Sequence, residues 1–445
     1  MKLATTYKEI LQISLPLIVA SFGHSLIGAT DTFFLGRSGN TGYLAAIGLV
    51  APLYFVITMV SLALARGGQI MIARRMGEGR FSSIGPIAQN MLYFELLFAT
   101  FCFFVMYYGG EYMLWFLIDS QELLDVSIEY LNYRILGVFF GCAGVTFISL
   151  YTGVARTGII IMTSVVMATV NIFLNYVLIF GYYGFPEMGM GGAGLASAIS
   201  EFFALLAFVA FAFWDKESEK YHLLKLPKVN FKEIITQVRL SAPLALQNFF
   251  GMISWVLLFG FIENIGEEEM AISSVMRVVY LFLGAIAWGL GSGTNTIVSK
   301  LIGEIRLKEV VPTLFKIAWV SLGLTALFSL PLLLIPELII GGITDDVAII
   351  EGTVRMMPML FFILLGVATY AIFYNGIIGT ADINFSLVIT FIGAVLYIAF
   401  AALFINVLHK NLQWAWSVEF IYSGFILISC MYYFFKTKRW FKVQL

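Results

Sequence analysis

Long runs of apolar residues follow one another along the whole chain, separated by short polar connectors. Several runs are longer than the ~20 residues that an α-helix needs to cross a bilayer, so we expect those helices to tilt or to extend beyond it. The pattern predicts an all-α integral membrane protein with twelve transmembrane helices, at residues 9–36, 42–73, 84–109, 122–154, 157–182, 191–214, 232–262, 270–300, 310–335, 347–378, 383–406 and 412–436.

A charged connector divides these helices into two sets of six. It covers residues 215–231, so the predicted domains are an N-terminal six-helix bundle at 1–214, a cytoplasmic linker, and a C-terminal six-helix bundle at 232–445. Because six spans are an even number, we expect both bundles to have the same orientation and to be related by an axis along the membrane normal.

Short motifs show that the two halves repeat each other. Pro16 to Gly39 and Pro243 to Gly266 have the same spacing of 23 residues, and the Gly-Glu-Gly-Arg run at 77–80 recurs as Gly-Glu-Ile-Arg 226 residues later. Repeated bundles of this kind enclose a cavity that can face either side of the membrane in turn. The repeat therefore predicts a transporter.

The composition excludes several classes of protein. Hydrophobic residues make up 60% of the 445 residues and charged residues 12%, whereas soluble domains are about 45–50% apolar and about 25% charged. A soluble enzyme, a disordered protein and a disulfide-stapled secreted module do not fit these values. Twelve helices of ~25 residues leave only about 11 residues per connector, which is too little for a separate soluble domain.

Lys and Arg occur mainly in alternate connectors, and the opposite connectors carry acidic residues with only two basic ones, Arg37 and Lys410. The positive-inside rule then places both termini in the cytoplasm, and the expected location is the cell (inner or plasma) membrane. A nucleic-acid-binding protein would gather its basic residues on one folded face. Nucleic acid is therefore excluded as a partner.

Four acidic residues lie within the apolar spans: Asp31, Glu95, Glu201 and Glu419. An ionisable side chain in the middle of a membrane helix costs ~3 kcal/mol, so each one is a candidate site. The alternative in each case is a structural hydrogen bond to a neighbouring helix, which we favour for Glu95 because we expect it near an interface. Glu201 in the sixth span and Glu419 in the twelfth have equivalent places in the two halves, and for them both interpretations stay open.

Asp31 shares one face of the first helix with His24 and Gly28, at spacings of seven and three residues. Pro16 lies about four turns earlier and removes a backbone hydrogen bond, so it is a candidate hinge. For His24, a packed and hydrogen-bonded histidine is the interpretation that we favour over a ligand.

Asn171 and Asn175 are four residues apart and share a face of the fifth span. Amide and carboxylate oxygens that meet at one depth suit a small hard cation or a network that holds a proton. Hydrogen bonding between helices is the alternative for this pair, and the residues alone do not separate the two.

Five motifs together resemble the multidrug and toxic compound extrusion (MATE) family over essentially the full length of the chain. They are Ser-Leu-Pro-Leu at 14–17, Ala-Thr-Asp-Thr-Phe-Phe-Leu-Gly at 29–36, Gly-Glu-Gly-Arg at 77–80, Asn-Ile-Phe-Leu-Asn at 171–175 and Gly-Ala-Gly-Leu-Ala-Ser at 192–197. The resemblance implies two six-helix bundles that form a V around a central cavity. It also implies that the protein is not an enzyme and that it exports organic, often cationic and amphipathic, compounds in exchange for H⁺ or Na⁺. We expect no cofactor besides the coupling ion, small organic molecules and membrane lipids as partners, and a monomer.

The resemblance places the coupling ion in the N-terminal bundle, on Asp31, Asn171, Asn175 and Ser197, with Asp31 as a metal ligand only if the ion is Na⁺. Some relatives have an acid at the position of Asn175. The Na⁺-coupled branch has acids in helices seven and ten where this chain has Gly251 and Val367, which favours the DinF-like branch. For the substrate cavity we expect contributions from Glu201, Gln247, Glu419 and His24.

Two other functions are considered. A flippase for lipid-linked oligosaccharides, from the same superfamily, would need a cationic cavity for a pyrophosphate, but the few intramembrane Arg and Lys are not concentrated in one half. A membrane-embedded enzyme would need a nucleophile–base pair or metal ligands at membrane depth. The single histidine within the spans and the absence of an H-E-x-x-H motif argue against it.

Overall fold

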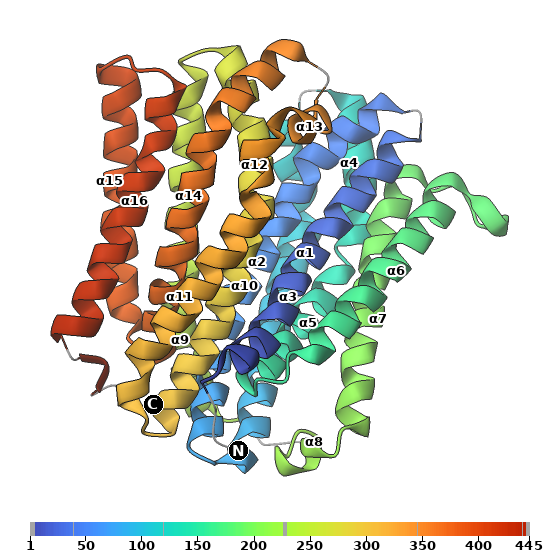
Figure 1. Ribbon diagram of the computed structural model, residues 1–445. Helices are drawn as coiled ribbons and strands as arrows, with labels where there is room; N and C mark the ends of the chain where they lie inside the picture. The colour runs from blue at the N-terminus through green and yellow to red at the C-terminus, as the bar shows by residue number, and fades with distance from the viewer. Residues whose placement is uncertain are drawn as a thin grey trace. The chain divides into compact units, whose positions relative to one another are not determined.

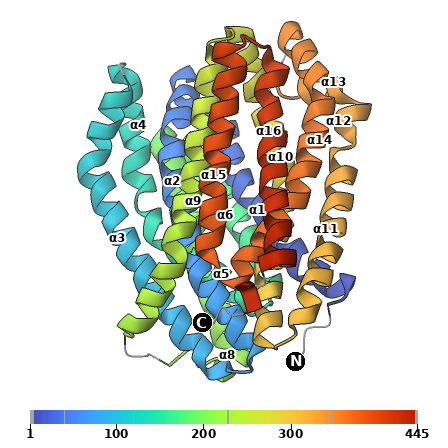
Figure 2. The same ribbon diagram turned by 90° about the vertical axis from the view of Figure 1, so that its left-hand side faces the viewer.

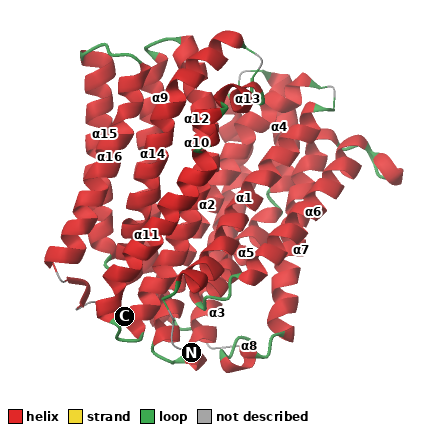
Figure 3. Ribbon diagram, in the orientation of Figure 1, coloured by secondary structure: helices red, strands yellow, loops and turns green. Residues whose placement is uncertain are grey.

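The computed structural model describes residues 5–38, 40–118, 120–225, 229–344, 346–437 and 439–441, and in this part of the chain every regular element is a helix (Figure 3). Eleven helices are long and apolar enough to cross a membrane. A bent pair of shorter helices, α4 and α5, makes a twelfth span if it is counted as one. The predicted all-α class and the twelve spans are confirmed.

The chain forms two compact units. Unit 1 consists of residues 1–18 and 243–445, and unit 2 of residues 19–242. The predicted domains divide the chain only at the connector, whereas the contacts assign the first segments of α1 (Tyr7–Gly36) and α9 (Phe231–Glu263) to the unit built mainly from the other half. The two division points lie at the equivalent prolines of the repeat, two residues after Pro16 and directly before Pro243.

Unit 2 is built from the second part of α1 and from the helices up to the first part of α9. Helices α3 and α4 pack against each other (Figure 2). The elements are α2 (Thr41–Gly77), η1 (Phe81–Ser83), α3 (Ile84–Leu117), α4 (Gln121–Arg134), α5 (Gly137–Gly153), α6 (Gly158–Phe180), η2 (Tyr182–Gly184), α7 (Gly189–Trp214) and α8 (Glu217–Lys220).

Unit 1 contains the remaining helices. Helix α14 packs against α10, α11 and α16, and α15 runs beside α16 (Figure 1). The elements are α10 (Glu267–Gly303), α11 (Leu307–Ser329), α12 (Pro331–Leu334), α13 (Pro336–Gly341), α14 (Val347–Thr380), α15 (Ile383–Ala402), η3 (Leu403–Val407), α16 (Leu412–Tyr432), η4 (Tyr433–Thr437) and η5 (Arg439–Phe441).

Two predicted helices are broken in the structure. The span expected at 122–154 consists of α4 and α5, which meet at an angle of 50°. The span expected at 310–335 corresponds to the candidate span Leu307–Leu334. Within it α11 ends at Ser329, and the short helices α12 and α13 follow, each beginning with a proline. Proline has no backbone N–H to donate and fits the first position of a new helix, which explains the second break.

The repeated Gly-Glu-x-Arg motif forms the same turn in both units. Gly79 and Ile305 both have left-handed backbone angles, with φ of 73° and 60°. In both turns the N–H of the next residue bonds to the carbonyl five residues back, at 3.0 Å from Arg80 and 2.9 Å from Arg306. The predicted internal repeat is confirmed at this turn, although Ile305 adopts without glycine a conformation that strains a β-branched residue.

Candidate functional site

Asp31 lies in a closed polar cluster within unit 2. Its Oδ1 accepts hydrogen bonds from Asn175 at 2.6 Å and from Asn171 at 3.2 Å, and its Oδ2 accepts one from the Ser197 hydroxyl at 2.8 Å. Asn171 also donates to Ser197 at 3.1 Å. All four side chains are buried, with Asp31 only 3% exposed. The structure therefore brings together the four residues expected to form the coupling-ion site.

The local sequence explains how three helices meet at this cluster. Asn171 and Asn175 project from one face of α6 because they are one helical turn apart. Glycines at the start of α7 allow the close approach that brings Ser197 within reach. A Cβ at Gly192 would stand 2.8 Å from the backbone of Leu178, and one at Gly194 would stand 2.5 Å from the Tyr130 carbonyl oxygen.

The cluster holds one formal charge and several neutral oxygens. Asp31 is its only ionisable member, and no described Lys, Arg or His side chain forms an ion pair with it. The Asn175 Oδ1 is buried and has no hydrogen-bond partner. One carboxylate beside an unused amide oxygen and a hydroxyl is a ligand set that suits a proton or a hard cation such as Na⁺.

Glu201 forms a buried ion pair with Arg134. Arg134 donates to both carboxylate oxygens, at 2.9 and 2.6 Å, and the Tyr54 hydroxyl donates to Oε2 at 2.9 Å. The guanidinium carbon also lies 3.4 Å from the centre of the Tyr54 ring. This glutamate therefore already has a cation, so contact with a cationic substrate would have to compete with Arg134.

The same ion pair lies at the break between α4 and α5. Gly137 begins α5, and a Cβ at this position would stand 2.4 Å from Arg134 Nη1 and 2.6 Å from Glu201 Oε2. A larger residue would push the two charged groups apart. An arginine inside a membrane is expected to pair with an acid or to extend to the membrane surface, and the sequence assigns Arg134 no site role beyond that. The structure shows the acid pair and identifies Glu201 as the partner.

Glu419 has a different environment, in unit 1. It is 2% exposed, and its Oε1 accepts a hydrogen bond from the Tyr397 hydroxyl at 2.9 Å. Aromatic side chains surround the pair: Tyr422 packs edge-on against the Tyr397 ring at 6.0 Å and against the Tyr370 ring at 5.8 Å. No described Lys, Arg or His forms an ion pair with Glu419. The two acids at equivalent places in the repeat therefore differ, since only Glu201 has a cationic partner.

Gln247 lies in a neutral network in unit 1. It donates to the Ser386 hydroxyl at 2.9 Å and accepts from the Tyr374 hydroxyl at 2.5 Å, which also contacts Thr390 at 2.8 Å. Its side chain is 5% exposed, so the network is buried. Both the nitrogen and the oxygen of the amide therefore have partners in unit 1.

The other predicted site residues give less detail. Pro16 is buried, and α1 continues through it as one helix. His24 is among the helical residues whose side chains lie outside the described part of the structure. At the positions where the Na⁺-coupled branch has acids, Gly251 is exposed and Val367 is fully buried.

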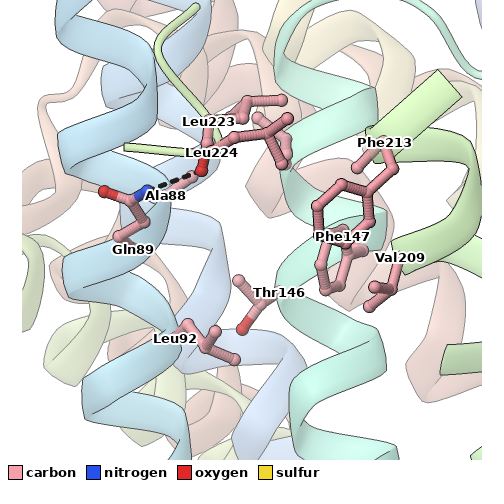
Figure 4. Close-up of a pocket in the computed structure, with 11 residues that line it drawn as sticks. Ala88, Gln89, Leu92, Thr146, Phe147, Val209, Phe213, Leu223 and Leu224 are labelled. Atoms are coloured by element: carbon pink, nitrogen blue, oxygen red, sulfur yellow. Dashed lines mark hydrogen bonds between the residues drawn. The ribbon is translucent and has the colours of Figure 1, made fainter. Parts of the chain in front are cut away.

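A separate cavity of about 120 Å³ lies in unit 2 beneath the connector. Apolar side chains of α3, α5 and α7 line it, together with Leu223 and Leu224 of the connector (Figure 4). Gln89 closes one side by donating to the Leu223 carbonyl at 2.6 Å. None of the predicted site residues whose side chains are described lines this cavity.

Comparisons with known proteins identify relatives of the whole chain. The MatE family model matches residues 16–177 and 243–403. A probable multidrug resistance protein NorM of Thermotoga maritima is 26% identical over 392 residues, which cover 86% of this chain and 82% of that protein. A probable multidrug resistance protein NorM of Bradyrhizobium diazoefficiens is 26% identical over 443 residues, covering 96% and 93%.

Solved structures show the same fold. A multidrug resistance MATE family transporter of the MOP superfamily, in an outward-facing conformation, superimposes with a TM-score of 0.88 at 17% identity and covers 98% of this chain and 97% of that one. A crystal structure of MATE in the straight conformation gives a TM-score of 0.87 at 18% identity, with the same coverage. At these identities the similarity shows the fold alone.

Proposed function

Because the chain belongs to the MatE family of membrane transporters, we propose that it is a secondary antiporter that exports organic, often cationic and amphipathic, compounds in exchange for H⁺ or Na⁺. The observation that carries this proposal is the Asp31 cluster. A single buried carboxylate, held by neutral donors that include an amide with an unused oxygen, can exchange a proton or a small cation. The relatives named as multidrug resistance proteins support the export of drugs.

In this proposal Asp31 alternates between an ionised state and a state that carries the proton or the cation. Pro16 lies two residues before the point where α1 passes from unit 1 to unit 2. A bend there would act on the segment that carries Asp31, so Pro16 is the proposed hinge. Export and ion entry are coupled because the ion and the substrate favour different states of this element.

The experiment that tests the proposal is transport in proteoliposomes. We expect an imposed pH gradient or an imposed Na⁺ gradient to drive uptake of a fluorescent amphipathic cation, and we expect the pH gradient to do so if the chain belongs to the DinF-like branch. Vesicles without the protein are the control. Uptake that responds to neither gradient would contradict the antiport.

Glu419 is the better candidate for contact with a cationic substrate, since Glu201 already pairs with Arg134. We expect Glu419→Gln to weaken the export of cationic compounds several-fold and to spare neutral ones, because the amide keeps the Tyr397 hydrogen bond but not the charge. Initial rates for a matched cationic and neutral pair would measure this. An equal loss for both compounds would assign Glu419 to structure. Gln247 and His24 remain proposed contributors to the substrate cavity.

We also propose a cell-membrane protein that acts as a monomer with both termini in the cytoplasm. Lys225 is exposed in the connector, and its backbone carbonyl accepts a hydrogen bond from Gln89. In a cysteine-free background, we expect Lys225→Cys to react with an impermeant thiol reagent in inside-out vesicles and not in intact cells. Labelling of intact cells would reverse the orientation.

No observation favours the flippase. A pyrophosphate would need free cationic side chains at membrane depth, but Glu201 neutralises Arg134. The alternative of a membrane-embedded enzyme is not favoured by a metal site either. No described cluster of three or more His, Cys, Asp and Glu side chains could hold a metal ion.

A further inference from the structure

Glu95 is a buried acid that the proposed coupling site does not use. It is the twelfth residue of α3, its exposed fraction is 0%, and its Oε2 accepts a hydrogen bond from the Ser61 hydroxyl of α2 at 2.6 Å. Its Oε1 is buried and has no hydrogen-bond partner. Glu95 is therefore buried inside unit 2, against Ser61 of α2, and its expected place near a membrane interface stays a prediction.

Among the described residues, no cationic side chain pairs with this carboxyl group. The titratable groups that face it are thiols, Cys102 on α3 itself and Cys142 on α5. From α2 the contact is Ser61, and no described Lys, Arg or His forms an ion pair with Glu95. A buried carboxylate without a cation and with one unused oxygen carries a large desolvation cost, and a bound proton removes that cost.

A small cavity adjoins the Ser61 hydroxyl. Its volume is about 10 Å³, close to the minimum that one water needs. Four side chains with polar atoms line it: Tyr54, Thr58 and Ser61 of α2 and Cys142 of α5. A water needs two to four polar partners, so this cavity is suited to hold one.

Gly141 of α5 also lines this cavity. A Cβ at Gly141 would stand 3.3 Å from the Tyr54 hydroxyl and 3.4 Å from Glu201 Oε2. At its other end the cavity reaches Ser61, the partner of Glu95. The cavity is therefore lined by Tyr54, which donates to Glu201, and by Ser61, which donates to Glu95.

We propose that Glu95 is a second proton-binding carboxyl group of unit 2 and that it exchanges its proton through Ser61 with a water in this cavity. In the neutral acid the proton is on Oε2 and is donated to Ser61 Oγ. On ionisation this proton passes to Ser61 Oγ, the hydroxyl proton of Ser61 passes to the water, and the water passes one proton on to solvent water. Ser61 and the cavity water thus stay neutral, and Glu95 becomes a carboxylate. The proposed protonation of Glu95 is argued from the geometry alone. The proposed role of Glu95 in transport rests on the proposed antiport.

Infrared difference spectroscopy tests the protonation directly on the purified full-length protein. We expect the wild type to show a carboxylic-acid C=O band that Glu95→Gln removes. If Glu95→Gln fails to fold, Glu95→Asp should shift the band instead. Identical bands in the wild type and a folded variant would overturn the proposal.

The role of the water is tested with a matched pair of glycine variants on α5. We expect Gly141→Ala to slow the deuterium shift of the Glu95 band at least several-fold, because the added methyl group displaces the water. Gly144→Ala is the control, since a Cβ there meets nothing within 4 Å. Equal exchange rates in both variants would overturn the proposed route.

The role of Glu95 in transport is tested separately in proteoliposomes, with ethidium as the transported probe. If Asp31 and Glu95 both release protons, Glu95→Gln should reduce the protons released on substrate binding by about one half. Unchanged proton release with transport intact would overturn the transport role of Glu95. Failure of the wild type to respond to any gradient would instead contradict the antiport and leave the infrared result valid.

Discussion

Asp31→Asn should reduce gradient-driven export to background while the protein still inserts, folds and binds its substrate. Asparagine keeps the size of the side chain and can still accept hydrogen bonds from Asn175 and Asn171 through Oδ1. Its Nδ2 can donate to Ser197 in place of the hydrogen bond that Asp31 Oδ2 accepts. What is lost is the charge, and with it the ability to alternate between two states.

The measurement compares binding and transport in the same preparation. Binding of a fluorescent amphipathic cation to the detergent-purified variant should stay within a few-fold of the wild type, because removing an intramembrane charge seldom destabilises a helix. Uptake under a pH gradient should equal that of empty vesicles, and substrate should release fewer protons. Normal pumping by Asp31→Asn together with an inactive His24→Ala would move the coupling group to the histidine.

The spans and the Asp31 site could be predicted because each depends on a signal that is local in sequence. Hydropathy marks a membrane helix because every apolar side chain in a span avoids water in the same way. The Asn171–Asn175 spacing marks one helix face. The resemblance to a known family then placed Ser197 beside them, which the hydrogen bonds to Asp31 and Asn171 bear out.

The bend in the fourth span could not be predicted in the same way. Residues 135 and 136, between α4 and α5, are apolar and give no break signal. The bend accompanies a contact between Arg134 and Glu201, which are 67 residues apart in the chain. A pattern in one segment cannot reveal a partner on another helix.

Glu201 and Glu419 also have partners that the sequence pattern does not reveal. Glu201 and Glu419 have equivalent places in sequence, which suggests one role for both. Their environments differ because α4 supplies an arginine to the first, whereas aromatic side chains of α14, α15 and α16 surround the second. A similar place in the sequence repeat therefore leaves the partners of a residue open.

The Arg134–Glu201 pair should have the largest effect of any pair in unit 2 on stability. Arg134→Met leaves Glu201 buried without its cation, and breaking a buried pair in this way costs about 3–5 kcal/mol. The Tyr54 hydroxyl would remain as a neutral donor, which does not replace the charge. Equilibrium unfolding of the purified protein in mixed micelles would measure the loss.

Two further variants separate the pair from a general effect of losing an arginine. Replacing both partners, as Arg134→Met with Glu201→Met, should recover most of the stability, because two apolar side chains leave no buried charge. Arg355→Met is the matched control: it removes an arginine from an exposed pair with Glu351, whose side chains are 77% and 67% exposed. Such a pair contributes about 0–1 kcal/mol, so this variant should unfold as the wild type does. If Arg134→Met were no less stable than Arg355→Met, or if the double replacement gave no recovery, the buried pair would not be what stabilises the junction of α4, α5 and α7.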